Sequence, residues 1–160
     1  PGTRRDRRIV PHAPRDVIRL DMRAALAQLG ALSFVETSPE LGGCIRIDPE
    51  HLLTGVGDII LVRRNMGSSY HLSVVVDDAD QGITDVVRGA DLFETPQIHV
   101  VLQSLLSLPV PRYHHHRLIR DAEGKRLAKR DDARAIAKYR SEGTSATDIR
   151  ETVGLRDIVT

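Results

Sequence analysis

Cysteine and aromatic residues are scarce in this sequence, and neither sign of charge predominates. Cys44 is the only cysteine of 160 residues, tryptophan is absent, and aromatic residues make up 3% of the chain. A single cysteine excludes an internal disulfide and a zinc site built from cysteines, so we expect a reducing cytoplasm. With 23 Lys and Arg against 22 Asp and Glu, the net charge of +1 does not by itself indicate a nucleic-acid-binding protein.

Long apolar runs are missing as well. No run of about 18 apolar residues occurs, which excludes a membrane span. The start lacks the apolar core of a signal peptide, and the first residue is Pro1 rather than methionine. We therefore expect no membrane contact, and we interpret the Pro1 start as a sign of a fragment or a processed chain.

The hydrophobic pattern predicts short strands alternating with helices. Strands or extended segments are expected at residues 17–20, 32–35, 44–47, 58–62, 72–76, 83–87 and 113–119. Helices are expected after the N-cap Asp21, after Thr95 with Pro96 as the first helical residue, over residues 133–141, and after Ser145 with Asp148 completing a capping box. This order favours an α/β architecture over a bundle or a sandwich.

Charged side chains follow two of the predicted strands. In open α/β sheets, ligands bind beyond the carboxyl ends of the strands, where we place Asp77 and Asp78 after one strand and Arg88 after the next. Arg88 could hold a carboxylate or phosphate through two parallel hydrogen bonds, or it could form a loop-closing ion pair with Asp78 or Asp91. The two aspartates could hold Mg²⁺ or simply end a strand. The residues alone leave these alternatives open.

Tyr70 and the run His114 to His116 permit weaker hypotheses. The Tyr70 hydroxyl could bind a small polar ligand, although packing at a sheet edge is the interpretation that the residue alone favours. Successive residues of a strand point to opposite faces, so only His114 and His116 could share a metal ion. We therefore predict no metal site and interpret the histidines as a solvated strand end.

A basic segment lies near the carboxyl end of the chain, at residues 124–130. Gly124 is followed by Lys125 and Arg126, then by Leu127 and Ala128, and then by Lys129 and Arg130. Small and apolar residues between the cations would let Lys129 approach phosphate oxygens and stabilise charge on a pyrophosphate leaving group. The alternative is a solvated surface turn.

Several motifs together resemble the glutamyl branch of the class I aminoacyl-tRNA synthetases. Residues 125–130 look like the KMSKS-type loop of that class, and the other matching segments are Tyr70 and residues 74–78, 82–92 and 95–97. The match runs from about residue 57 to 130 and depends on an ordered set of motifs. Within the branch, the chain is most similar to shortened relatives without an anticodon-binding domain.

The resemblance implies an α/β fold: the second half of a Rossmann-like class I catalytic domain, with a small α+β insertion and C-terminal helices. It implies three parts, namely residues 1–56 as the insertion, 57–120 as the catalytic half, and 121–160 as the KMSKS-like loop and helices. It further implies a cytoplasmic, monomeric enzyme that uses ATP and Mg²⁺ to activate L-glutamate and transfers it to queuosine in the anticodon of tRNA(Asp).

Site residues follow from the same resemblance. Tyr70 and Arg88 would bind glutamate, which replaces the packing interpretation of Tyr70. ATP would be contacted by the loop residues Arg126, Leu127, Ala128, Lys129 and Arg130, with Lys129 as the catalytic cation.

The sequence departs from the family at its start. Arg4 stands where the family carries its last zinc-binding cysteine, which argues against a zinc site of the family type. The family's front half, with its HIGH-like ATP motif, has no counterpart in the chain. We therefore interpret the chain as the carboxyl-terminal portion of a longer enzyme and expect it to be inactive alone. The alternatives are a fragment of a glutamyl-tRNA synthetase that charges tRNA(Glu), and a non-catalytic nucleotide- or tRNA-binding module.

Overall fold

The structure is a computed structural model, which describes residues 16–64, 67–120, 123–124, 126–127 and 135–155. The chain divides into two compact units, residues 1–116 and 117–160. The three-part division expected from the sequence stays a prediction.

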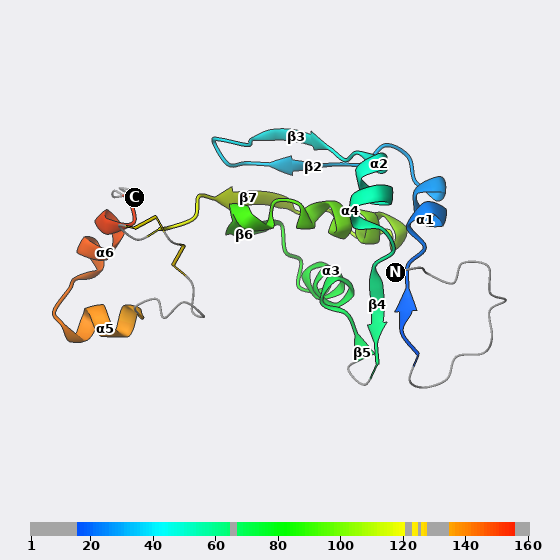
Figure 1. Cartoon of the computed structure of the whole chain (residues 1–160). Helices are drawn as coiled ribbons and strands as arrows, with labels where there is room; N and C mark the ends of the chain where they lie inside the picture. Colours follow the sequence, from blue (N-terminus) through cyan, green and yellow to red (C-terminus); the bar gives the residue numbers. More distant parts are fainter. Residues whose placement is uncertain (1–15, 65–66, 121–122, 125, 128–134, 156–160) are drawn as a thin grey trace. The chain divides into compact units, whose positions relative to one another are not determined.

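A four-stranded mixed sheet organises the first unit (Figure 1). Its strands are ordered β3 (Gly43–Arg46), β2 (Ser33–Glu36), β7 (Arg112–His116) and β6 (Asp85–Gly89). The first two form an antiparallel hairpin, whereas β7 runs parallel to both β2 and β6. A smaller antiparallel sheet joins β1 (Ile18–Arg19), β4 (Ile60–Arg63) and β5 (Gly67–Ser68).

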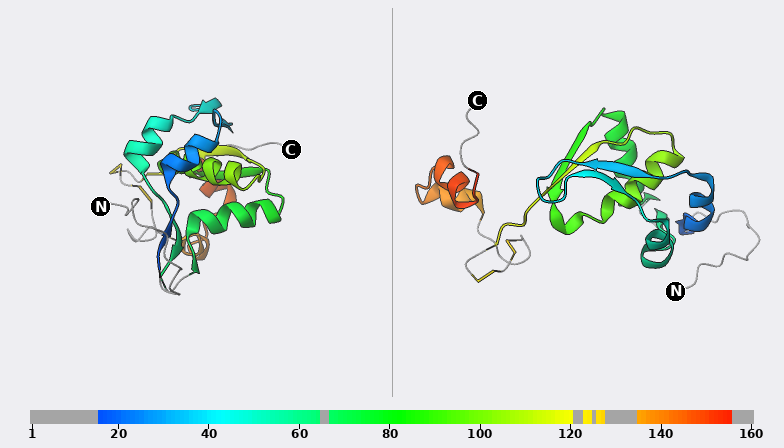
Figure 2. Two further views of the ribbon diagram at one scale, coloured as in Figure 1. Left: turned by 90° about the vertical axis from the view of Figure 1, so that its right-hand side faces the viewer. Right: turned by 90° about the horizontal axis from the view of Figure 1, so that it is seen from above.

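Helices connect and cover these strands. The first half contains α1 (Met22–Gln28) and α2 (Pro49–His51), which continues into a π-helical turn, η1 (Leu52–Val56). The second half contains α3 (Tyr70–Asp80), the 3₁₀ turn η2 (Ala90–Leu92) and α4 (Thr95–Leu105). Figure 2 shows α3 and α4 side by side, and α4 also packs against β2. None of the helices in the described part of the chain has the length and apolar composition needed to cross a membrane.

One face of the four-stranded sheet is buried. Alternate residues turn Phe34 of β2 and Tyr113 of β7 toward the helices, and their rings meet edge to face at 5.3 Å. Val75 of α3 and Val101 of α4 complete the same core with no exposed surface. On the opposite face, Val87 is 67% exposed. The period of two therefore decides which side chains of these strands face the core.

The strand predicted at residues 72–76 is wrong, because this segment belongs to α3. The Ser69 hydroxyl caps the helix by accepting a hydrogen bond from the Leu72 amide at 3.3 Å. Val75 is buried whereas Val76 is 44% exposed, which a helix packed on one side produces. Packing against α4 and the cap outweigh the β propensity of the three consecutive valines.

Other local predictions are confirmed or slightly shifted. Asp21 caps α1 through a 3.0 Å hydrogen bond from the Ala24 amide, as expected. Glu94, not Thr95, occupies the N-cap position of α4, and Thr95 is its first helical residue. The helix at residues 49–56 was not predicted, although Asp48 before Pro49 is a suitable helix start.

The second unit contains two short helices, α5 (Ile136–Ser141) and α6 (Ala146–Thr152), joined by a turn at Gly143. The predicted capping box is confirmed: the Ser145 hydroxyl accepts from the Asp148 amide at 3.1 Å, and the Asp148 carboxylate accepts from the Ser145 amide at 2.9 Å.

Candidate functional site

Arg88 lies on β6 beside β7, with its guanidinium half-buried. Its Nε donates a hydrogen bond to Nε2 of His115 at 3.3 Å, and its guanidinium carbon lies 5.3 Å from the centre of the Tyr113 ring. The terminal nitrogen Nη2 is buried and has no hydrogen-bond partner among the described residues. A buried donor without a partner is costly in a folded protein, so this nitrogen is a candidate to donate to a ligand.

Of the two ion pairs that the sequence left open for Arg88, with Asp78 or with Asp91, the pair with Asp78 is not formed within the described residues. Burial lowers the pKa of Arg88, whereas Tyr113, Tyr70, Asp78 and then Glu36 act on it in the opposite direction. An arginine keeps its charge through such shifts. The site therefore presents a permanent, partly desolvated cation.

Tyr113 forms the surface on which the Arg88 guanidinium rests. The ring is 1% exposed, and burial raises the pKa of its hydroxyl, while a hydrogen bond with Gln103 acts to lower it. The face of a neutral aromatic ring attracts a guanidinium. The ring thus holds Arg88 by packing and electrostatics together.

Glu36 and His115 form a buried pair next to Arg88. His115 Nδ1 lies 2.6 Å from Glu36 Oε2, and both side chains are inaccessible to solvent. Burial acts to raise the pKa of Glu36, but hydrogen bonds from the side chain and amide of His115 and from Ser38 outweigh it and lower the pKa to about 2. The carboxylate is therefore ionised in the folded protein.

Tyr70 is the first residue of α3, two residues before the segment that was predicted as a strand. Its side chain is 58% exposed, so the interpretation as a packed residue is not supported. Its ring lies 5.4 Å from His71 and 6.2 Å from His99. Tyr70 also acts electrostatically on Arg88, so the two predicted glutamate-binding residues belong to one neighbourhood.

His71 and His99 contact each other beside Tyr70, with 3.1 Å between His71 Nδ1 and His99 Nε2. Burial, aided by the charges of Arg88 and His71, lowers the pKa of His99 to about 3. The pKa of His71 is lowered as well, mainly by burial and further by the positive charges of Arg63 and Arg88. Both imidazoles are therefore neutral at neutral pH, and one ring donates to the other.

The expectation that Asp77 and Asp78 follow the end of a strand is wrong, because both residues lie within α3. Burial raises the pKa of Asp78, with a further contribution from Asp77 and an opposing one from Arg88. Among the residues that the structure describes, no three His, Cys, Asp or Glu side chains lie close enough together to hold a metal ion.

The histidine run is not simply a solvated strand end. His116 is exposed, whereas His115 is 3% exposed and pairs with Glu36. His114, on the other face, contacts the Thr37 hydroxyl through Nδ1 at 3.0 Å. The alternation expected for a strand is confirmed, but it turns His115 rather than its two neighbours toward the core.

The basic segment belongs to the second unit and is only partly described. Arg126 pairs with Arg120 in an isolated antiparallel bridge, and the Leu127 amide donates to the Ile119 carbonyl at 3.0 Å. Gly124 has a φ of +78°, which favours glycine at this turn. Ala128, Lys129 and Arg130 lie outside the described residues, so their roles stay predictions.

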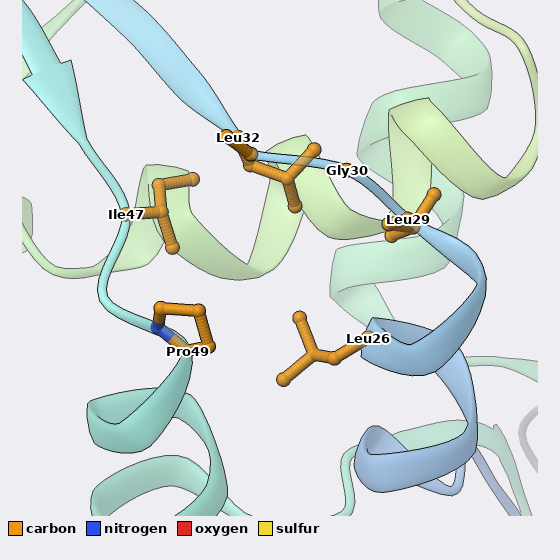
Figure 3. Close-up of a pocket in the computed structure, with 7 residues that line it drawn as sticks. Leu26, Leu29, Gly30, Leu32, Ile47 and Pro49 are labelled. Atoms are coloured by element: carbon orange, nitrogen blue, oxygen red, sulfur yellow. The ribbon is translucent and has the colours of Figure 1, made fainter.

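An apolar pocket of about 320 Å³ lies elsewhere in the first unit (Figure 3). It is lined by residues of α1, of the segment leading to β2, and of the approach to α2: Leu26, Leu29, Gly30, Ala31, Leu32, Ile47 and Pro49. No predicted site residue lines it, and it offers no charged side chain. It therefore has no part in the site around Arg88.

Four residues of this neighbourhood were not predicted from the sequence, namely Glu36, His71, His99 and His115. The alternation Phe34 to Glu36 on β2, and Tyr113 to His115 on β7, places a polar residue on an apolar face in each strand. That pattern could have indicated a buried Glu–His pair. No local pattern brings His71 to His99, because 28 residues separate them.

Comparisons with known proteins agree with the fold. A profile of the family described as tRNA synthetases class I (E and Q), catalytic domain, matches residues 29–159. A glutamyl-Q tRNA(Asp) synthetase of Rhodobacter capsulatus is 56% identical over 97% of this chain and 56% of its own length. One from Verminephrobacter eiseniae is 46% identical over 58% of this chain and 32% of its own length. The chain thus spans about half the length of the first of these relatives.

Solved structures of glutamate-tRNA synthetases are similar as well. The enzyme of Elizabethkingia anophelis aligns with a TM-score of 0.51 and 27% identity, over 64% of this chain and 19% of that one. The enzyme of Elizabethkingia meningosepticum, in complex with its amino acid, gives a TM-score of 0.52 at the same identity and coverage. The parallel strands β6 and β7, the helices beside them and the family match together show that this chain belongs to the class I glutamyl and glutaminyl tRNA synthetases and has the α/β fold of their catalytic domain.

Proposed function

We propose that this chain is the carboxyl-terminal portion of an enzyme that activates L-glutamate with ATP and transfers it to queuosine in the anticodon of tRNA(Asp). The observation that carries the proposal is the Arg88 guanidinium, which is held at Nε and has a buried terminal nitrogen without a partner. The 56% identity to a glutamyl-Q tRNA(Asp) synthetase supports this acceptor over others.

Arg88 suits a glutamate carboxylate for geometric reasons. Because Nε donates to His115, the carboxylate would approach the end of the guanidinium and accept from its two terminal nitrogens. Tyr70, exposed at the start of α3, would add its hydroxyl to the same ligand. The neutral pair His71 and His99 adds no charge that would compete with Arg88 for the carboxylate.

The reaction would proceed by adenylate formation. A glutamate carboxylate oxygen attacks the α-phosphorus of ATP, the bond to the β-phosphate oxygen breaks, and pyrophosphate leaves. Lys129, with Arg126 to Arg130 around it, would stabilise the charge on the leaving pyrophosphate. Mg²⁺, when bound to the phosphates, neutralises part of their charge. The protein contributes positioning and electrostatic stabilisation rather than a covalent intermediate. We still predict that the enzyme is cytoplasmic and monomeric.

Two features support the proposal of a longer enzyme. Among the described strands, β6 lies at one edge of its sheet, and Val87 of that strand is 67% exposed. The first relative contains further sequence beyond the part that the chain matches, since the match covers 56% of its length. A preceding half would supply further strands and the HIGH-like motif.

A second candidate is a glutamyl-tRNA synthetase that charges tRNA(Glu). The structural similarity to two glutamate-tRNA synthetases favours it. The two candidates share glutamate activation and differ in the acceptor. A non-catalytic nucleotide- or tRNA-binding module would activate no amino acid at all.

Glutamate-dependent exchange between ATP and pyrophosphate tests the activation step. In the full-length protein, Lys129→Ala should lower the exchange rate by about a hundredfold or more, because a group that stabilises transition-state charge is removed. Lys138→Ala, at an exposed lysine of α5, is the matched control and should leave exchange unchanged. Exchange that persists in Lys129→Ala would contradict the loop assignment, and absence of exchange in the unaltered protein would favour the non-catalytic module.

A further inference from the structure

Three polar side chains lie in a row across the buried face of the four-stranded sheet. Glu36, His115 and Arg88 belong to the neighbouring strands β2, β7 and β6, respectively. His115 and Arg88 are register partners in the parallel pair of β6 and β7. The sheet itself therefore fixes the spacing between His115 and Arg88, while Glu36 is the register partner of Tyr113.

The hydrogen bonds define which nitrogen of His115 carries the proton. Arg88 Nε always carries a hydrogen, so it donates and Nε2 of His115 must accept. The remaining nitrogen, Nδ1, then carries the proton and donates to Glu36 Oε2 at 2.6 Å. A doubly protonated ring would place an N–H against the Arg88 N–H. A ring that carries one proton, at Nδ1, is the form that satisfies both contacts.

Glu36 is bound from several sides. Its Oε1 accepts from the amides of Ser38 at 2.9 Å and of His115 at 3.0 Å, while Oε2 accepts from the His115 ring. The carboxylate is thus anchored by backbone and side chain together. The negative charge of Glu36 balances the positive charge of Arg88, and the His115 ring lies between the two groups.

We propose that Glu36 and His115 are positioning residues for glutamate binding. Glu36 fixes the tautomer and orientation of His115, and His115 orients the Arg88 guanidinium so that its terminal nitrogens face the ligand. This inference rests on the proposed role of Arg88 in binding glutamate. The alternative is a polar pair that only stabilises the sheet.

The position of the His115 proton tests the inference without any substitution. Nitrogen-15 NMR of the imidazole in the full-length protein at neutral pH should show Nδ1 protonated and Nε2 unprotonated. A ring protonated at Nε2, or at both nitrogens, would overturn the proposal. This measurement does not depend on catalysis, so it stands whatever amino acid the enzyme uses.

Glu36→Gln tests the effect on binding. The amide oxygen can still accept from the two backbone amides, but its NH₂ group would face Nδ1 and shift the ring proton to Nε2, against the Arg88 N–H. We expect the KM for glutamate to rise about ten- to a hundredfold, the cost of one charge-assisted hydrogen bond, with the KM for ATP little changed. NMR of this variant should show the reversed tautomer.

Asp85→Asn is the matched control. It also converts a carboxylate to an amide on β6, but Asp85 forms an exposed ion pair with Arg112 at 2.8 Å and has no contact with His115 among the described residues. Its KM for glutamate should equal that of the unaltered protein. If Glu36→Gln folds, shows the reversed tautomer and keeps the normal KM for glutamate, the pair is only structural. If the unaltered protein shows no glutamate-dependent exchange, the proposed function fails while the tautomer result remains valid.

Discussion

At the scale of single residues, Arg88 combines a fixed end with an available one. His115 and the Tyr113 ring hold the guanidinium, and a buried terminal nitrogen lacks a partner among the described residues. A lysine has neither the planar shape nor enough donors in fixed directions to make both kinds of contact. The identity of this side chain, and not only its charge, therefore matters for the account.

Arg88→Lys should weaken glutamate use. We expect the KM for glutamate in the exchange reaction to rise about ten- to a hundredfold, because two directed hydrogen bonds to a carboxylate become at most one. Arg112→Lys, at the exposed arginine of the neighbouring strand, is the control and should change little. A normal KM in Arg88→Lys would mean that Arg88 has a structural role only.

His99 should make stability depend on pH. Its pKa is lowered to about 3 in the folded protein, against 6.5 ordinarily, so the unfolded chain binds a proton first as the pH falls. The free energy of unfolding that this shift contributes is present above the ordinary pKa and is lost on acidification, by about 2 kcal/mol between about pH 6.5 and about pH 4.5.

Denaturant unfolding at a series of pH values measures this effect. His99→Gln keeps a hydrogen-bonding group near His71 but cannot take up a proton, so its free energy of unfolding should fall less steeply over the same pH interval. The partner His71, whose pKa is also lowered, leaves a residual slope. A slope unchanged from that of the unaltered protein would contradict the assignment to His99.

At the scale of elements, the sequence predicts the strands of the four-stranded sheet well and α3 poorly. Residues 32–35, 44–47 and 83–87 fall on or next to real strands because each is a short apolar run between turns. The run of valines in α3 has the same composition, and only the Ser69 cap and contact with α4 decide for a helix. Tertiary contact is not visible in a local window of sequence.

The turn between β2 and β3 should not tolerate a side chain at Gly42. A Cβ added at Gly42 would lie 2.5 Å from the backbone oxygen of Ser38, so Gly42→Ala should destabilise the protein by about 2 kcal/mol or more. Gly30→Ala is the control, since an added Cβ there meets no atom within 4 Å. Its effect should stay within about 0.5 kcal/mol.

Chemical or thermal unfolding of both variants checks this prediction. Equal stabilities of Gly42→Ala and Gly30→Ala would show that the turn can relax around a methyl group.

The candidate site shows the same limit of sequence reasoning. Arg88 and Tyr70 could be proposed from motifs that stand in a characteristic order along the chain. The Glu36, His115 and Arg88 row could not, because it depends on the spatial strand order β2, β7, β6, which differs from the order in sequence. The contact of His71 with His99 depends in the same way on the packing of α3 against α4.

At the scale of the whole molecule, the chain has the catalytic-domain fold of its family but spans about half of its first relative. Arg88 lies in one compact unit, and the basic segment begins in the other. The proposed glutamate-binding and phosphate-binding residues thus belong to separate units of the chain. The account predicts that both are needed, together with a preceding half, for activation.

Transfer of labelled glutamate by the full-length protein tests the central claim most directly. Purified tRNA(Asp) bearing queuosine, tRNA(Asp) without queuosine, and tRNA(Glu) would each be offered with ATP and Mg²⁺. The account predicts label only on tRNA(Asp) that bears queuosine. Label on tRNA(Glu), or on none of the three, would contradict it.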